Sequence, residues 1–392
     1  MSIPIPEKPA AALAALHTAG IGAWVVGGAV RDSLLDRPVT DWDLTVACQP
    51  EELLSILPEA KPIGGVYGTV SWHGVEITPC RTEEGYSDNR HPDQVVFGAD
   101  IRADLARRDF TVNAIAYDGK TAIDPYRGHI DLQNRLLRCV GEPARRFQED
   151  ALRILRLYRF AGVLDFSIEP ETELAALALA ETLSTVSAPR VRGELTKALL
   201  GAKPSALAPL IAAEGLTEFA LPADGLVENP AGLEPMDQVP CKLLYRWWAL
   251  LRLTGANLKR AAEVFGFSKT FLRDLTRLDR LYEAGCPADR HAMKLALMEG
   301  LPFDPADAFA AFAALNDKFV DAPALYQDLV KSGEPYLKEH LCITPAELLV
   351  EEIPGRKISK VQACLVKAVV DTPAFNVYPT LVQMARGLKN VL

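Results

Sequence analysis

The pattern of apolar and polar residues changes character once along this chain of 392 residues, near residue 141. Before that point, a predicted helix over residues 9–20 is followed by short runs that predict strands. These runs cover residues 23–30, 42–46, 69–72, 75–78, 110–117 and 122–123. After residue 141, strand-like alternation nearly disappears, and Pro and Gly separate helical segments. The sequence therefore predicts the α+β class, with a mixed head at the N-terminus and an all-helical remainder.

The helical remainder begins with a strongly predicted helix over residues 147–163, which is rich in Leu, Arg and Ala. Residues 203–240 are rich in Pro and Gly and predict a connection between helical modules. Amphipathic helices follow, for example over residues 242–253 and 359–370. We therefore divide the chain into three predicted domains, which cover residues 1–140, 141–220 and 221–392.

The composition is that of an ordinary globular protein, and it constrains the compartment. No stretch approaches the roughly 18 apolar residues of a membrane span, and the first residues lack the pattern of a signal peptide. The seven cysteines are dispersed without a C-x-x-C pair, which favours free thiols in a reducing compartment over a zinc site. We therefore expect a cytoplasmic protein with no membrane partner.

The net charge of −9 argues at first against nucleic acid as a partner, but the distribution of charge matters more than its sum. Residues 102–159 contain twelve Lys or Arg and eight Asp or Glu. A locally basic surface inside an acidic protein fits a phosphate-bearing partner. A solvated face of mixed charge gives the same count, so both interpretations stay open.

Two aspartates, Asp41 and Asp43, follow a glycine turn at Gly27 and Gly28. On an extended strand, residues two apart point to the same face, so the two carboxylates repel each other unless a cation lies between them. Mg²⁺ suits such a pair, because it binds one or two carboxylates together with water and substrate phosphates. The glycines allow the backbone to approach a phosphate, and Arg31 adds a fork of donors. The segment predicts a metal-dependent site that handles nucleotides.

Three further residues of the head are candidates for the same site. Glu76 lies between apolar residues on the strand predicted next to that of the aspartates, where it is either a third acidic group or a solvent-facing glutamate. Arg108 lies in a short segment with two arginines, and its planar fork suits phosphate oxygens. Asp109 is placed to hold an arginine or to act at a hinge.

A row of charged residues at steps of three lies on the predicted helix over residues 147–163; it consists of Asp150, Arg153, Arg156 and Arg159. Each step of three turns the side chain back by about 60° on a continuous helix. Asp150 and Arg153 are therefore predicted to be neighbours, and Arg159 lies about half a turn from Asp150. An ion-paired helix face in solvent would show the same spacing.

Asp150 and Arg153 together could recognise the edge of a nucleotide base by hydrogen bonds. A carboxylate accepts hydrogen bonds and a guanidinium donates them. Cytosine and adenine present an amino donor beside a ring-nitrogen acceptor, whereas uracil and guanine present the reverse order. One such pair could therefore accept C or A and reject U and G, because a wrong base leaves buried polar groups unmatched.

At this point the chain resembles a class II tRNA nucleotidyltransferase, the CCA-adding enzyme, of the family shared with bacterial poly(A) polymerases. The segments that carry the resemblance are GGAVRD followed by DWD, then RRDFTVNAIA, DPYRGHIDL and EDALRILRLYRFAG. They occur in the order of that family over residues 22–165, and the set is specific although each segment alone is not. Residues 220–392 contain no recognisable motif.

The resemblance implies a polymerase-β-like nucleotidyltransferase head followed by helical neck, body and tail domains that hold tRNA. It implies Mg²⁺ at Asp41 and Asp43, with Glu76 as a third catalytic acid. It also implies binding of CTP and ATP beside the tRNA 3′ end, and recognition of the base edge by Asp150 and Arg153. The nucleotide-binding residues that it implies are Gly27, Gly28, Arg31, Arg108, Asp109, Asp150, Arg153, Arg156 and Arg159.

The resemblance also implies a flexible loop over residues 83–97 that helps the enzyme change from C to A. Three alternatives stay open at this stage. The nearest is a poly(A) polymerase with the same chemistry, although residues 64–70 resemble the CCA-adding version. A partial enzyme that adds only C or only A is the second, and a non-catalytic RNA-binding protein is the third.

Overall fold

The computed structural model describes residues 3–63, 65–85, 94–213, 216, 230–389 and 391. The chain forms two compact units, Met1–Leu221 and Pro222–Leu392. The division between them lies inside the interval over residues 203–240 that the sequence predicts as a connection. The further division of the first unit into a head and a neck stays a prediction.

In the described part of the first unit, seven strands form one sheet in the order β3-β4-β5-β2-β1-β8-β9. The neighbouring strands are antiparallel except β2 and β5, which run parallel. The strands are β1 (Ala23–Val26), β2 (Asp43–Val46), β3 (Lys61–Pro62), β4 (Val70–Trp72), β5 (Val75–Pro79), β8 (Ala116–Tyr117) and β9 (Ala122–Ile123). Each of the six runs that predict strands contains a strand of this sheet, but two are much shorter than predicted. Gly28 already begins a helix, and Thr111–Asn113 form a 3-10 helix, so the prediction of a strand over residues 110–117 was wrong in its first part.

The hairpin between β4 and β5 turns at His73 and Gly74, where the sequence predicts it. Both residues have positive φ, 51° and 86°, as the tightest hairpin turns require. The turn matters for the site because it fixes the register of β5. In that register Glu76 is the partner of Asp43 on the parallel neighbour β2.

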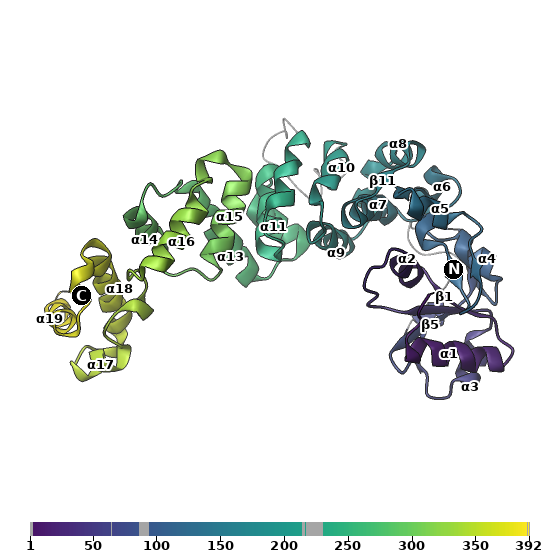
Figure 1. Ribbon diagram of the computed structural model, residues 1–392, viewed down its shortest axis with the longest axis horizontal. Helices are drawn as coiled ribbons and strands as arrows, with labels where there is room; N and C mark the ends of the chain where they lie inside the picture. Colours follow the sequence, from purple (N-terminus) through teal and green to yellow (C-terminus); the bar gives the residue numbers. More distant parts are fainter. Residues whose placement is uncertain are drawn as a thin grey trace. The chain divides into compact units, whose positions relative to one another are not determined.

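Helices of the first unit surround the sheet and continue beyond it. The described ones are α1 (Glu7–Thr18), α2 (Gly28–Leu34), α3 (Pro50–Ile56), α4 (Ile101–Ala106), α5 (Gly128–Gln133), α6 (Pro143–Glu149), α7 (Leu152–Leu164), α8 (Pro170–Ala178), α9 (Ala188–Leu199) and α10 (Ala208–Ala212). Helix α1 packs against β1 and β5, and α7 packs against α9 (Figure 1).

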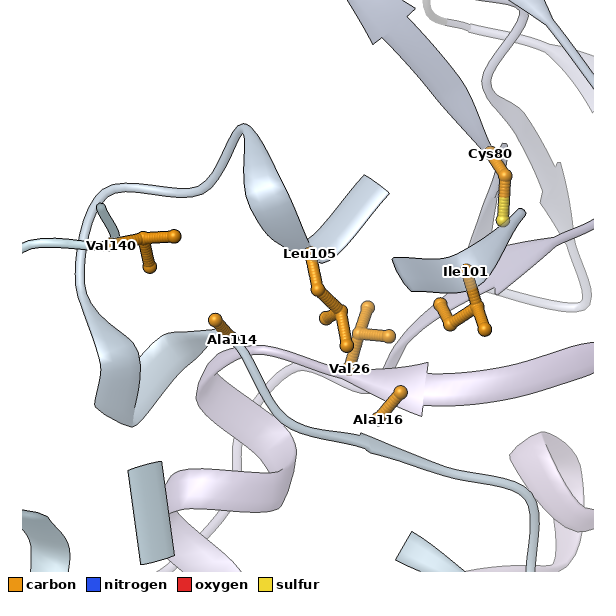
Figure 2. Packing of buried hydrophobic residues seen from close by; sticks show 7 residues of the cluster. All are labelled: Val26, Cys80, Ile101, Leu105, Ala114, Ala116 and Val140. Atoms are coloured by element: carbon orange, nitrogen blue, oxygen red, sulfur yellow. The ribbon is translucent and has the colours of Figure 1, made fainter. Parts of the chain in front are cut away.

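A small apolar cluster joins the end of β1 to helix α4 and to the segment before β8. Figure 2 shows its buried members, which are Val26, Cys80, Ile101, Leu105, Ala114, Ala116 and Val140. Burial raises the pKa of the Cys80 thiol to about 12, so this cysteine acts as a small apolar residue. The cluster fixes Val26 in place, and Val26 is the residue immediately before the glycine turn. All seven cysteines are free, as predicted.

Two short ribbons accompany the main sheet. Strands β6 (Arg81–Glu84) and β7 (Gln94–Phe97) pair antiparallel, and β10 (Leu136–Leu137) and β11 (Ser167–Ile168) pair parallel. The prediction of a loop over residues 83–97 was therefore wrong at both ends, where backbone pairing forms a ribbon. Its remaining residues, 86–93, which include Tyr86, Asp88, Arg90 and Pro92, lie outside the described residues.

Over the residues that the structure describes, the second unit consists of helices and their connecting segments, with no strand. Its helices are α11 (Leu243–Leu253), α12 (Leu258–Phe265), α13 (Lys269–Glu283), α14 (Arg290–Leu297), α15 (Pro305–Leu315), α16 (Ala322–Ser332), α17 (Pro345–Val350), α18 (Gly355–Asp371) and α19 (Tyr378–Leu388). Trp248 is fully buried against Tyr282 and Phe312 and joins three of these helices. Within the described ranges, no helix has the length and apolar character that a membrane crossing requires.

Candidate active site

The glycine turn connects β1 to α2 and has a steric reason to contain glycine. Gly27 has a φ of 66°, which side-chain-bearing residues rarely adopt. A Cβ atom at Gly27 would lie 3.0 Å from Nη1 of Arg108, so the missing side chain also makes room for that guanidinium. Arg31, on the first turns of α2, is buried and donates a 2.6 Å hydrogen bond to Oδ1 of Asn113. The turn thus brings two cations to one place.

The three predicted acids line one cavity of about 670 Å³, which we call the acid cavity. Asp43 begins β2, and Glu76 is its register partner on β5. Asp41 precedes the strand by two residues, so the prediction that both aspartates lie on the strand was wrong for Asp41. The cavity lining nevertheless includes Asp41 together with Asp43 and Glu76.

The electrostatics of Asp43 show that this group of acids is unfavourable without a cation. Partial removal from water raises the pKa of Asp43, and the nearby charges of Glu76 and Asp41 raise it further. Within the described chain, none of the three carboxylates forms an ion pair, and Asp41 accepts only a hydrogen bond from the Thr40 hydroxyl. Carboxylate oxygens without a basic partner fit the ligand preference of a divalent ion such as Mg²⁺.

The acid cavity does not by itself supply a complete set of protein ligands for a metal ion. The described residues contain no group of three His, Cys, Asp or Glu side chains arranged to hold a metal ion. Mg²⁺ does not require one, because it commonly uses one or two carboxylates and fills its other positions with water and substrate phosphates. The acid cavity therefore fits a metal that binds together with its substrate.

A second cavity of about 520 Å³, which we call the arginine cavity, borders the first at Asp43. All nine residues that the sequence predicted to bind nucleotide lie in its wall. The lining residues are Gly27, Gly28, Arg31, Asp43, Arg107, Arg108, Asp109, Asn113, Asp150, Leu152, Arg153, Arg156, Arg159, Phe160 and Arg190. The structure thus brings together segments from residues 27–190, and their roles in binding stay predictions.

The helix predicted over residues 147–163 is interrupted at Asp150. Helix α6 ends at Glu149, Asp150 is extended with φ −149° and ψ 104°, and α7 begins at Leu152. The Asp150 carboxylate accepts the Leu152 backbone N–H at 3.1 Å and Nη2 of Arg190 at 2.8 Å. The prediction of a continuous helix was wrong because these two contacts stabilise a local break that the apolar pattern does not reveal.

Asp150 and Arg153 both line the arginine cavity, but they do not bond to each other. Arg153 donates to Oε2 of Glu149 at 2.8 Å and to the backbone carbonyls of Arg146 and Arg107. Each of the two side chains therefore has its own fixed partner, and their common role in reading a base stays a prediction. Those partners hold both side chains in place while leaving part of each group free to bond elsewhere.

Asp109 is the anchor of the arginine row on α7. Its Oδ2 accepts from Nε and Nη2 of Arg156 at 2.9 and 2.6 Å, and its Oδ1 accepts from the Asn113 amide and the Phe110 N–H. Burial alone would raise the pKa of Asp109, but the charge and hydrogen bonds of Arg156 outweigh it and hold this pKa well below the ordinary range. Arg159 lies beside Glu194, with Nε and Oε2 2.6 Å apart.

Phe160 was not among the predicted site residues, although three guanidinium groups lie around its ring. The Cζ atoms of Arg159, Arg31 and Arg156 lie 3.9, 5.1 and 5.4 Å from its ring centre. The negative face of an aromatic ring attracts cations, so Phe160 holds like charges close together. Its position four residues after Arg156 was the only available signal. Arg190, which contacts Asp150, has none, because it is 40 residues away in sequence.

Comparison with known proteins places the chain in a family. Residues 23–138 match the poly A polymerase head domain, and residues 165–223 match a probable RNA- and SrmB-binding site of polymerase A. The CCA-adding enzyme of Limosilactobacillus fermentum is 34% identical, over 98% of this chain and 96% of the relative. The chain belongs to the CCA-adding enzyme family. The CCA-adding enzyme of Enterococcus faecalis is 32% identical over 98% of this chain and 97% of its own.

Solved structures of CCA-adding enzymes share the fold. That of Bacillus stearothermophilus in complex with CTP has a TM-score of 0.75 and 26% identity, and covers 99% of this chain and 100% of its own. That of Thermotoga maritima complexed with tRNA-CCA has a TM-score of 0.70 and 20% identity over 98% and 96%. The predicted fold class, an α+β head followed by helical domains, is confirmed.

Proposed function

We propose that this chain adds C, C and A to the 3′ end of tRNA without a nucleic-acid template, using CTP and ATP and releasing pyrophosphate. Similarity over nearly the whole length to relatives named CCA-adding enzymes supports the reaction. One observation assigns the reaction to particular residues: Asp43 lines both the acid cavity and the arginine cavity. Such a junction can hold a metal, a triphosphate and an attacking hydroxyl at one point.

The arginine cavity supplies the binding energy for the triphosphate in this proposal. Arg31 and Arg108 flank the glycine turn, and their planar forks match phosphate oxygens. Gly27 and Gly28 let the backbone approach the phosphates. Arg108 also bonds to the buried carboxylate of Asp104 at 3.0 Å, which fixes its position before a substrate arrives.

Asp41 and Asp43 would hold Mg²⁺, with Glu76 close by on β5. When bound there, the ion would lower the pKa of the RNA 3′-hydroxyl and neutralise charge that develops at the α-phosphate. The 3′ oxygen forms a bond to the α-phosphorus, pyrophosphate leaves with the electron pair of the broken P–O bond, and the hydroxyl proton passes to water. The charge of the acids and their fixed register are this chain's contribution to that step.

Recognition of the base is assigned to Asp150 and Arg153, with Arg156 and Arg159 assisting. Arg190 holds one oxygen of Asp150 and Glu149 holds one amino group of Arg153, so both groups are oriented before a nucleotide binds. Each carboxylate oxygen has a second lone pair, and a guanidinium has five N–H donors. At least one acceptor and one donor are therefore left for cytosine or adenine.

Replacement of Asp150 or Arg153 by alanine should impair the choice of nucleotide more than the binding of tRNA. A two-point contact to a base contributes roughly 10- to 100-fold discrimination, and we expect a loss of that size for C and A against U and G. Competition between CTP and UTP, together with a tRNA binding assay, would measure both quantities. The matched control is Arg102→Ala, an exposed arginine on α4 outside both cavities. Full selectivity in the Asp150 variant would refute its role.

Labelled CTP and ATP, offered to tRNA that lacks its CCA end, test the reaction itself. We expect two C residues and one A at each 3′ end, in that order, seen as single-nucleotide steps on a sequencing gel. A long run of A would identify a poly(A) polymerase, and a product that stops after C or takes only A would identify a partial enzyme. No product, with tRNA still bound, would support a non-catalytic RNA-binding protein. A cytoplasmic location stays a prediction.

A further inference from the structure

The acid cavity has more in its wall than the three acids that the reaction requires. Its lining includes Pro6 and the first turn of α1, the residues around Asp41, and the turn between β4 and β5. Two of these residues, Lys8 and Trp42, have no role in holding a metal. Lys8 is exposed, and Trp42 is partly buried, so part of each side chain is open to the cavity.

The position of Asp43 between the two cavities determines which ligand each one receives. In a transfer of a nucleotidyl group, the attacking oxygen and the leaving pyrophosphate lie roughly in line on opposite sides of the phosphorus. The arginine cavity carries the positive charge that pyrophosphate needs. The attacking hydroxyl must then reach Asp43 from the other side, which is the acid cavity.

We propose that the acid cavity is the binding site for the 3′-terminal nucleotide of the RNA, with its base against Trp42 and its 5′-phosphate beside Lys8. This inference rests on the proposed function and extends it to Trp42 and Lys8, to which the resemblance assigns no role. The volume of about 670 Å³ suits one nucleotide.

The chemistry of the lining agrees with this occupant. Four carboxylates, those of Glu7, Asp41, Asp43 and Glu76, line the cavity, and Lys8 is the cation among its described lining residues. Carboxylates repel phosphates but accept hydrogen bonds from hydroxyl groups, which the end of an RNA chain presents as its 2′- and 3′-OH. The phosphate of that nucleotide would lie at Lys8.

Trp42 suits a site whose occupant changes during the reaction. In the proposed addition, the terminal base is first that of the unfinished tRNA, then C, then a second C. A site that read this base by hydrogen bonds would reject one of these ends. Stacking on an aromatic ring tolerates every base because every base has a π-face. An aromatic residue beside the reaction centre therefore holds each successive end without selecting among them.

The test compares Trp42→Ala, Trp42→Phe and Lys8→Ala with the unmodified protein, using tRNA that lacks CCA and tRNAs that end in C and in CC. We expect Trp42→Ala to raise the KM for all three tRNAs about tenfold. The KM for CTP should stay within roughly twofold, because the arginine cavity is intact. Trp42→Phe should restore most of the affinity, and Lys8→Ala should raise the KM for tRNA several-fold. Lys120→Ala, an exposed lysine outside both cavities, is the matched control.

A crosslinking experiment tests where the RNA end binds, independently of whether the protein adds nucleotides. A tRNA whose last nucleotide is 4-thiouridine is irradiated with the unmodified protein, and the crosslinked peptide is mapped. Crosslinks within residues 6–9 or 40–43 support the inference even if the protein adds no nucleotide, in which case only the proposed function fails. Crosslinks confined to the arginine cavity, or an unchanged KM for tRNA in a folded Trp42→Ala variant, overturn the inference even if CCA is added.

Discussion

Replacement of Asp43 by asparagine is expected to lower the rate of C addition and of A addition equally, by a factor on the order of a thousand or more. The side chain keeps its size but loses the charge that faces both cavities. Removal of a single preorganised electrostatic group at a reaction centre already costs roughly 10² to 10³ in kcat. A carboxylate that holds a divalent ion should contribute at least that much, and Asp41→Ala should have a similar effect. Single-turnover incorporation of labelled CTP and ATP measures it.

The melting temperature of the Asp43→Asn variant is the control for this experiment. We expect it to stay the same or to rise slightly, whereas the activity falls. The raised pKa of Asp43 means that the fold disfavours its charged form, chiefly through loss of water and then through Glu76 and Asp41. The neutral asparagine should therefore leave the melting temperature unchanged or slightly higher. An inactive variant that melts well below the unmodified protein would indicate a folding defect. A stable Asp43→Asn variant with ordinary activity would remove the basis of the proposed mechanism.

Features that depend on a few consecutive residues could be predicted from the sequence. The glycine turn, the hairpin at His73 and Gly74, and the strand that begins at Asp43 all depend on a few consecutive residues. Their local preferences and the wider fold agree, so the sequence predicted them. Glu76 was predictable as a candidate for the same reason, because a strand next to that of Asp43 places it at the same level of the sheet.

The break at Asp150 could not be predicted, because the residues on both sides continue a helical pattern. What stabilises the break is Arg190, which comes from α9 and is 40 residues away in sequence. The spacing of three predicts Asp150 and Arg153 as neighbours on one continuous helix, whereas α6 and α7 are separate helices that meet at Asp150. Arg190, the partner of Asp150, depends on tertiary packing that no spacing in the sequence reports, whereas Glu149, the partner of Arg153, is four residues away in the sequence.

The arrangement of the arginine cavity also depends on contacts between residues that are far apart in the sequence. The sequence identified five of its seven arginines, since Arg is a frequent ligand of phosphate, but it could not show how they stay together without a substrate. They are held by ion pairs with buried acids and by the ring of Phe160. The acids are Asp104, Asp109 and Glu194. These residues keep the guanidinium groups close while part of each one still faces the cavity. They are also where the fold is most sensitive to substitution.

Asp109→Asn is expected to destabilise the first unit by about 3 kcal/mol, the lower end of the range for breaking a buried ion pair. The lower end applies because the Arg156 side chain is 32% exposed, so water compensates part of the loss. An amide cannot replace the carboxylate, because both oxygens of Asp109 accept from donors. Whichever way the amide is turned, its NH₂ group faces either Arg156 or the donors of Phe110 and Asn113.

The pH dependence of this loss of stability shows whether it comes from the broken ion pair or from altered packing. The folded-state pKa of Asp109 lies below its unfolded value, so its contribution is fully present above the ordinary carboxyl pKa, about pH 4, and is lost as the pH falls toward the folded-state value. The difference in unfolding free energy between the unmodified protein and Asp109→Asn should therefore be constant from pH 8 to about pH 5 and shrink below about pH 4.

Denaturant unfolding followed by circular dichroism at several pH values measures that difference, and Asp165→Asn is the matched control. Asp165 forms the same kind of pair with Arg135, but its side chain is 47% exposed, and asparagine tolerates its φ of 57°. An exposed pair contributes less than about 1 kcal/mol, so this variant should change little. If Asp109→Asn cost no more than Asp165→Asn, or if its cost did not fall in acid, Asp109 would not be the anchor of the arginine row. The arginines would then owe their arrangement to Phe160 and Glu194, and removal of those residues should have the larger effect.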